Sequence, residues 1–291
     1  MANTPVVVLD DTMTSIANAI RAKTGGSATM TPGQMPAQIA SIPSGGSVGI
    51  TREVSAQGVY QMPAQSFTFS LPANATDVGA RALSNAFREC TGITSADLGS
   101  ITGVSGRSAF YYAFYGCTSL ASANFGSLAA VSEKDAFNCA FYGCTSLASA
   151  NFPLLTTISG NDAFYYAFYG CTSLASINLN ALSTISGSSI MSSAFENCTN
   201  LTSVNFASLS TISGGNALSY AFRGCTSLTS ISFPALTSSS FPGTVVNQLS
   251  GLVSGVTGCT LHFPASTQAK IETLTGYPNF GGTNTTVLFD L

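Results

Sequence analysis

The string "AFYGCTSLAS" occupies residues 113–122 and recurs without substitution at residues 140–149 and 167–176. Each copy begins 27 residues after the one before it, so this interval is a structural period. More divergent copies begin at residue 86 with "AFRECTGITS" and at residues 194 and 221 with "AFENCTNLTS" and "AFRGCTSLTS". Six units therefore run from about residue 82 to about residue 236, and one cysteine recurs in each of them, at Cys90, Cys117, Cys144, Cys171, Cys198 and Cys225.

Apolar residues follow a fixed rhythm inside each unit. They fall at the eighth, eleventh, thirteenth and sixteenth positions, as in Leu174, Ile177, Leu179 and Leu182. This is the spacing of leucine-rich repeats, whose periods are about 20 to 29 residues. The eleventh and thirteenth positions alternate with Ser and Asn, which predicts a short strand with one buried face. Six such strands in register would form a parallel sheet about 25 to 30 Å long.

A second apolar pair, such as Ala163 and Phe164, recurs later in the unit and indicates a return leg opposite the sheet. We expect this leg to be a short helix or 3₁₀ turn, because Ala-Phe recurs only three residues after the pair. An "ISG"-like turn precedes the leg, and positive φ is the expected reason for its glycine. These glycines are Gly106, Gly160, Gly187 and Gly214.

Over roughly residues 82–264 the chain resembles the BspA-like leucine-rich repeats, whose units carry "AFxxCxxLxxVxLP" and occur in bacterial surface proteins and in phages. The resemblance implies an α/β solenoid of six 27-residue units, with a parallel sheet on one face and short helical or 3₁₀ return legs. The unit is a few residues longer than is usual for that family.

The N-terminal part, residues 1–47, has a different pattern. Two short amphipathic helices are expected in "LDDTMTSIANAIRAKTGG" and "TPGQMPAQIASI", followed by a linker at residues 43–47. Such small helices cannot bury their apolar faces alone, so they need a partner surface or further copies. The segment resembles N-terminal segments of structural and tail-associated proteins of phages that infect Gram-positive gut bacteria. That resemblance implies virion attachment through the apolar residues Met13, Ile16, Ile20, Met35, Ile39 and Ile42.

Atypical segments are expected to close both ends of the solenoid. Residues 48–81 alternate enough to predict a strand-rich N-terminal cap. The C-terminal cap, residues 265–291, is expected to hold a short helix near Thr267–Leu274 and a final strand.

Charge is the unusual feature of the composition. Only 7% of the 291 residues are Asp, Glu, Lys or Arg, against a usual quarter, while 45% are apolar, so the surface must consist largely of Ser, Thr, Asn, Gly and Tyr. Nine basic residues and no polybasic run argue against nucleic acid and against an anionic membrane as partners. No apolar stretch is long enough to span a bilayer. The start "MANTPVVVLDD" does not read as a secretory signal peptide, which favours assembly in the host cytoplasm and location in the virion.

No constellation typical of an enzyme is present in the sequence. The six in-register cysteines would lie about 5 Å apart, where disulfides are possible, but their Phe and Leu neighbours favour reduced thiols in a core. Cys139 takes the place of a tyrosine and is expected to be partly exposed. His262 is the single histidine, and Asp162 is the only acid between residues 136 and 195, so a hydrolytic triad and a carboxylate pair are both disfavoured. We expect no catalytic residues, no metal and no cofactor.

Two surface features remain as ligand-binding candidates. Polar ladders on the exposed sheet face could either form hydrogen bonds between repeats or bind a hydroxyl-rich ligand. Tyrosines near the return legs could bind a ligand, pack inward, or mediate self-association. The ladder candidates are Asn124, Asn151, Asn178 and Asn205; the tyrosine candidates are Tyr111, Tyr112, Tyr115, Tyr142, Tyr165, Tyr166 and Tyr169.

The sequence thus favours a non-enzymatic bacteriophage virion protein, a head or tail fibre, that displays a leucine-rich repeat domain for host-surface adhesion. Its expected partners are other virion proteins, a host surface glycan or protein, and further copies of itself, with a trimer as the expected oligomer. A bacterial cell-surface adhesin is the alternative, although it predicts a signal peptide and a wall anchor. A carbohydrate-active enzyme is the second alternative, and it lacks an acid/base pair.

Overall fold

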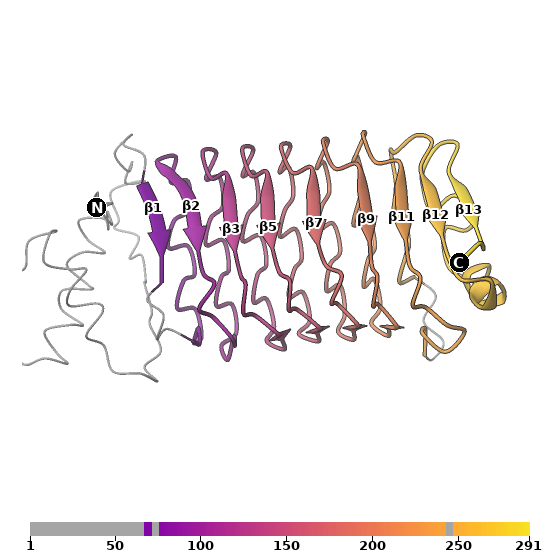
Figure 1. Ribbon diagram of the computed structural model, residues 1–291, viewed down its shortest axis with the longest axis horizontal. Coiled ribbons are helices and arrows are strands. Elements are labelled where there is room, and N and C mark those ends of the chain that lie inside the picture. Colours follow the sequence, from indigo (N-terminus) through magenta and orange to yellow (C-terminus); the bar gives the residue numbers. More distant parts are fainter. Residues whose placement is uncertain (1–66, 72–75, 243–246) are drawn as a thin grey trace, which may run out of the picture.

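The computed structural model describes residues 67–71, 76–242 and 247–291. These residues form a straight solenoid of about eight turns, here called coils, in which the chain advances steadily along the long axis (Figure 1). The helices predicted in residues 1–47 and most of the predicted N-terminal cap lie outside the described residues. The boundaries of the four predicted segments stay predictions.

A parallel sheet forms one side of every coil, as predicted. Its first part has the order β1-β2-β3-β5-β7, and its second part runs from β9 to β13 along the same side (Figure 1). From β2 to β7 each strand pairs with the equivalent residues 27 positions later, so that Ser122, Ser149 and Ser176 lie opposite one another. The strands are β1 (Phe67–Ser70), β2 (Ile93–Asp97), β3 (Ser122–Asn124), β5 (Ser149–Asn151), β7 (Ser176–Asn178), β9 (Ser203–Asn205), β11 (Ser230–Ser232), β12 (Thr260–His262) and β13 (Thr286–Leu288).

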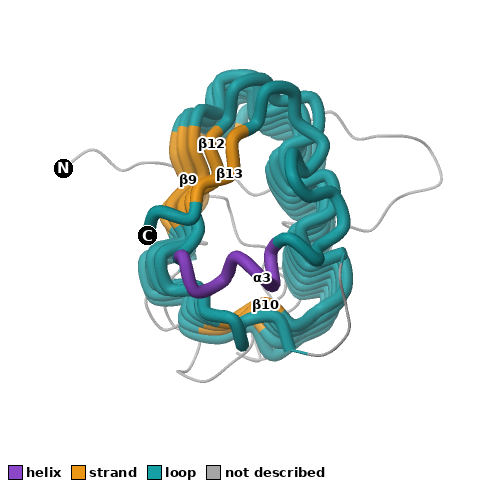
Figure 2. Tube along the Cα trace, turned by 90° about the vertical axis from the view of Figure 1, so that its right-hand side faces the viewer, coloured by secondary structure: helices purple, strands orange, loops and turns teal. Residues whose placement is uncertain are grey.

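A second, smaller parallel sheet was not predicted. It lies on another side of the coil and consists of β4 (Ala130–Val131), β6 (Thr157–Ile158), β8 (Thr184–Ile185) and β10 (Thr211–Ile212). Figure 2 shows the resulting cross-section, with the large sheet, the small sheet and the return legs on three different sides. Strands of two residues are too short to show an alternating pattern, which is why the sequence did not reveal them.

The return legs differ from the prediction of a helix or 3₁₀ turn. They are runs of consecutive turns, in which residues bond alternately within the coil and to the next coil. Ala140 N–H donates to the Phe137 carbonyl at 3.0 Å, whereas Phe141 N–H donates to the Ala167 carbonyl at 2.8 Å. Every fourth residue has a positive φ, as at Asp135 (57°) and Cys139 (53°), which a helix does not allow. Half of the N–H groups are thereby committed to the neighbouring coil, so the leg is a third inter-coil surface.

Glycine is required before the return legs for a different reason from the predicted one. Gly160 and Gly214 are not in the positive-φ region; the glycines that are include Gly116, Gly143 and Gly170. A Cβ added to Gly214 would lie 1.8 Å from the carbonyl oxygen of Gly187 in the preceding coil, and one added to Gly160 would lie 2.1 Å from that of Glu133. Close approach of two backbones, not conformation, excludes a side chain here.

The core consists of columns of identical side chains. Phe114, Phe141, Phe168, and Phe195 stack with ring centroids 5.2 to 5.3 Å apart and nearly parallel planes. At the C-terminal end the short helices η2 (Ala265–Thr267) and α3 (Gln268–Ile271) cross the end of the solenoid (Figure 2). They are the only helices among the described residues, and they lie where the sequence predicted one.

Candidate binding surfaces

The asparagine ladder consists of Asn124, Asn151, Asn178 and Asn205, one per strand from β3 to β9, all exposed on the outer face of the large sheet. The buried strand residue that precedes each of them fixes this orientation. Asn124 Nδ2 donates to Asp97 Oδ1 at 3.0 Å, and Asn178 Oδ1 accepts from the Asn180 N–H at 3.2 Å. Among the described residues, no side-chain hydrogen bond joins one asparagine of the ladder to the next. The amides of the central strands are therefore directed to solvent and available to a ligand.

The tyrosine face is formed by the seven candidate tyrosines, which the structure brings together on three consecutive return legs. Tyr115, Tyr142 and Tyr169 stack in one column, with centroid distances of 4.9 and 4.4 Å and planes within 14° of parallel. Two further pairs flank this column at the outer coils, with 4.4 Å between centroids in each: Tyr111 with Tyr112, and Tyr165 with Tyr166. All seven side chains are half-buried.

The ring faces of the central tyrosine column already contact neighbouring side chains. Arg88 places its guanidinium carbon 5.0 Å from the ring centroid of Tyr115, which covers one end of the stack. Tyr142 is sandwiched between Tyr115 and Tyr169. The same tyrosines can therefore serve two purposes. Their ring faces pack against one another within the chain, while their ring edges and hydroxyls remain accessible to a partner.

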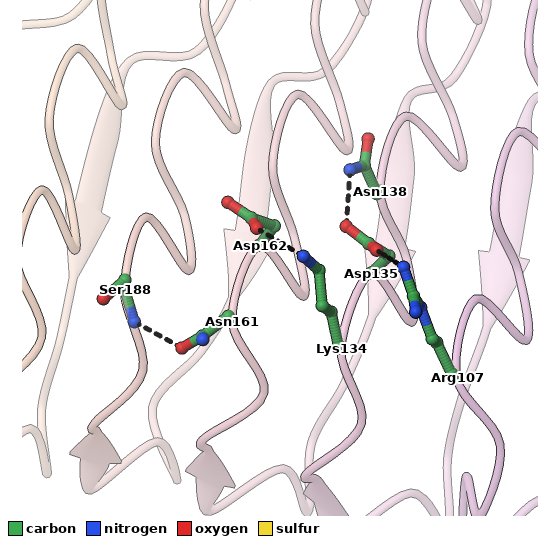
Figure 3. Close-up of polar contacts among 7 residues, drawn as sticks. All are labelled: Arg107, Lys134, Asp135, Asn138, Asn161, Asp162 and Ser188. Carbon is green, nitrogen blue, oxygen red and sulfur yellow. Dashed lines mark hydrogen bonds and ion pairs between the residues drawn. The ribbon is translucent and has the colours of Figure 1, made fainter.

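A short row of charges borders the tyrosine face where the return legs begin (Figure 3). Arg107 lies 3.6 Å from Asp135 in the next coil, and Lys134 lies 3.9 Å from Asp162 in the coil after it. The Asn138 side chain, between the two tyrosine pairs, donates to Asp135 at 3.1 Å. Sequence reasoning did not bring these residues together, because their proximity depends on the conformation of the return legs.

Burial alters the acid–base behaviour of the tyrosine face. It raises the pKa of Tyr142 to about 12, with the neighbouring Tyr169 as a further cause, and that of Tyr165 to about 12, with Tyr166 as a further cause. Burial also raises the pKa of Tyr112, to which a hydrogen bond with Cys139 contributes. These hydroxyls stay protonated at neutral pH and can donate hydrogen bonds to a partner.

The cysteines are free and buried, as predicted for the six in the column. From Cys117 onward each column thiol donates to a phenylalanine carbonyl of the preceding coil, as from Cys171 to Phe141 at 3.1 Å. Burial raises the pKa of Cys144 to about 12, so these thiols are poor nucleophiles. The prediction of a partly exposed Cys139 was wrong: only 6% of it is exposed, because tyrosines of the flanking coils pack around it.

His262 contacts a carboxylate near the C-terminus. Its Nδ1 lies 3.0 Å from both carboxylate oxygens of Asp290, next to the C-terminal strand. Within residues 67–71, 76–242 and 247–291, no group of three or more His, Cys, Asp or Glu side chains is arranged to hold a metal ion. No helix in this part of the chain is long and apolar enough to cross a membrane.

Comparison with known proteins agrees with this geometry. A family model for the BspA type leucine rich repeat region, six copies, matches residues 60–166 and 165–244, more than half of the chain. The chain belongs to this family. Leucine-rich repeats of this type form a generic fold for protein interaction or adhesion, and no catalytic family is indicated.

The crystal structure of a leucine rich repeat protein from T. pallidum, TpLRR, aligns with 18% identity and a TM-score of 0.35, over 76% of this chain and 87% of that one. No curated protein matches the chain. The six predicted attachment residues, from Met13 to Ile42, lie outside the described residues.

Proposed function

We propose that this BspA-type protein is a non-enzymatic bacteriophage virion component, a head or tail fibre, that binds a glycan or protein of the host surface through its large sheet. Residues 1–47 attach it to other virion proteins. This attachment role is supported by the resemblance of the N-terminal segment to phage structural proteins.

The observation that carries the adhesion role is the asparagine ladder. From β5 to β9 the outer face of the sheet presents one exposed amide and one exposed serine hydroxyl per strand, at a spacing of about 4.8 Å. No charged residue occurs in these strands. An array of uncharged donors and acceptors at regular spacing suits a hydroxyl-rich polymer, because each amide supplies two donors and an acceptor without the desolvation cost of a charge.

Adsorption of the purified full-length protein to host cells tests this role. We expect the double substitution Asn151→Ala and Asn178→Ala to reduce binding about tenfold, since two amides that each form a hydrogen bond would be lost. The matched control is Asn200→Ala, which removes an exposed amide from the turn before β9 rather than from the ladder. Equal adsorption of the double variant and the wild type would exclude the sheet face.

Attachment is tested separately, with particles that lack this protein. Wild-type protein should co-sediment with the particles, whereas Ile16→Asp combined with Ile20→Asp should not, because charges would interrupt the predicted apolar face. Failure of the wild-type protein to associate with particles would remove the virion role and leave the adhesion role to be judged on the sheet variants.

A further inference from the structure

The tyrosine face has a two-fold pattern along the solenoid axis. Its middle coil contributes Tyr142, with Asn138 and Cys139 in the positions that hold tyrosines on either side. The coil before and the coil after each contribute three tyrosines at equivalent positions. All three legs have the same backbone conformation. A 180° rotation about an axis that runs along the middle leg, perpendicular to the solenoid axis, therefore brings each triad to the level of the other.

The charges bordering this face follow the same axis with opposite sign. The leg before the middle coil begins with Arg107, whose side chain is 61% exposed, and the leg after it begins with Asn161 and Asp162. Glu133, Lys134 and Asp135 lie on the middle coil, which therefore has two acidic residues and one basic residue. The row therefore runs from basic on the first coil, through mixed charge on the middle coil, to acidic on the third (Figure 3).

The other edge of the face has one charged residue beyond each end of the tyrosine column. Arg88 occupies the column of Tyr115, Tyr142 and Tyr169 two coils before the centre, and Glu196 occupies it two coils after the centre. Each has a partner of its own: Arg88 lies 3.4 Å from Glu89, and Glu196 lies 3.6 Å from Arg223. Glu196 is buried, with only 7% exposed, so the Arg107 edge is the one with accessible charges of opposite sign at its two ends.

We infer that the tyrosine face binds a second copy of this chain, in an antiparallel pair with its two-fold axis at the Tyr142 coil. In this arrangement Arg107 of each copy faces the coil that carries Asp162 in the partner. A parallel pair places each coil against the same coil of the partner and does not bring Arg107 opposite Asp162.

The chemistry of the face supports protein as its occupant. Interfaces between proteins are enriched in Tyr and Arg, and tyrosine loses little side-chain entropy on binding. The faces of the stacked rings are already covered, so they are not available for stacking on sugar rings, while the edges and protonated hydroxyls suit another protein surface. Two copies also share the same coil spacing, so contacts that form at one coil are repeated at the next.

This pairing leaves the large sheets of both copies free, because the sheet and the return legs lie on different sides of the coil (Figure 2). A pair therefore presents two asparagine ladders and gains avidity for a polymeric ligand. The inference does not depend on the proposed function, since a pair would form whether or not the sheet binds a glycan. It also differs from a trimer formed through residues 1–47, because an antiparallel pair places the β1 ends of the two solenoids at opposite ends of the pair.

Sedimentation equilibrium of the full-length chain, at about 1 to 100 μM, tests the inference with a charge exchange. The wild-type chain should form a dimer. If residues 1–47 also associate, the wild-type protein should form a dimer of that oligomer. Arg107→Glu and Asp162→Arg should each raise the dissociation constant about tenfold, because each places like charges together at two symmetric positions. The double variant should return to within about threefold of wild type, since it restores opposite charges across the axis. Circular dichroism of each variant establishes that it is folded.

Ser176→Glu, on the large sheet, is the control and should leave association unchanged. A wild-type chain without this association at the highest concentration would overturn the inference. So would single variants that associate like wild type, or a folded double variant that is no better than the single ones. A trimer formed through residues 1–47 alone would be insensitive to all of these substitutions and would likewise overturn it.

Discussion

Replacing Gly214 by alanine tests the close approach of neighbouring coils. The added Cβ would lie 1.8 Å from the Gly187 carbonyl oxygen and 2.4 Å from its carbon, whereas real Cβ contacts are essentially never under 3.0 Å. The two coils must therefore separate locally by about 1 Å, since both obstacles are backbone atoms that no rotamer change can move.

The cost follows from the hydrogen bonds that this separation breaks. Ser213 N–H donates to the Ile185 carbonyl at 2.9 Å, and Ser189 N–H donates to the Gly215 carbonyl at 2.8 Å, on either side of the contact. Lengthening both by about 1 Å takes them beyond hydrogen-bonding distance. The loss of each bond costs about 1 to 3 kcal/mol, so Gly214→Ala should lower the free energy of unfolding by about 2 to 6 kcal/mol.

Gly143→Ala is the matched control. Gly143 has φ of 69°, and the nearest atom to an added Cβ is Gly116 Cα at 4.0 Å, so only the left-handed backbone is unfavourable, at about 1 to 2 kcal/mol. Both substitutions reduce the entropy of the unfolded chain equally. Urea denaturation followed by circular dichroism compares them. A Gly143 variant as unstable as the Gly214 variant, or less stable, would show that the packing argument is wrong.

Three other predictions concern the core and the tyrosine face. Phe168→Ala removes a ring stacked 5.2 and 5.3 Å from its neighbours and should lower the free energy of unfolding by about 3 to 5 kcal/mol in urea denaturation, while Phe168→Leu should cost clearly less. Burial raises the pKa of Cys144 and Cys225 to about 12. Their stabilising effect is therefore complete below about pH 8.5, where unfolded thiols begin to ionise, and is lost as the pH rises towards 12. The urea midpoint should fall across this range, and a constant midpoint would contradict the burial of the thiols. Absorbance titration of the phenols should show Tyr142 ionising near pH 12, and its titration near pH 10 in the folded protein would contradict its burial in the stack.

The period of the sequence was sufficient to predict the central part of the large sheet, because one repeat length sets the register of the strands from β2 to β7. Ser122, Ser149 and Ser176 had to lie opposite one another once their neighbours were assigned to a strand. The cysteine column followed for the same reason. The return legs could not be predicted, since their alternation of bonds within a coil and between coils depends on positive φ at residues such as Asp135 and Cys139, whose types do not require it.

The candidate surfaces were predicted to different degrees. The polar residues of the large sheet could be assigned to its outer face, because side chains alternate along a strand. The tyrosines could be assigned to the return legs but not to a single stack, because that requires the direction of each side chain. The charged border was not predicted at all: Arg107 and Asp135 are 28 residues apart and meet only because the legs lie one coil apart.

In a solenoid of equal coils, a surface made only of repeated residues can bind a partner in as many registers as it has coils. A single register requires residues that depart from the repeat. The large sheet offers few such departures, since Asn124, Asn151, Asn178 and Asn205 present the same amide on successive strands, and this suits a polymer that may slide along it. The return legs depart from the repeat at Asn138 and Cys139 within the tyrosine face, and at Arg88 and Glu196 on the coils that flank it. A partner bound there has one favoured position, which is the condition that a two-fold pair must meet and that adhesion to a repetitive polymer does not.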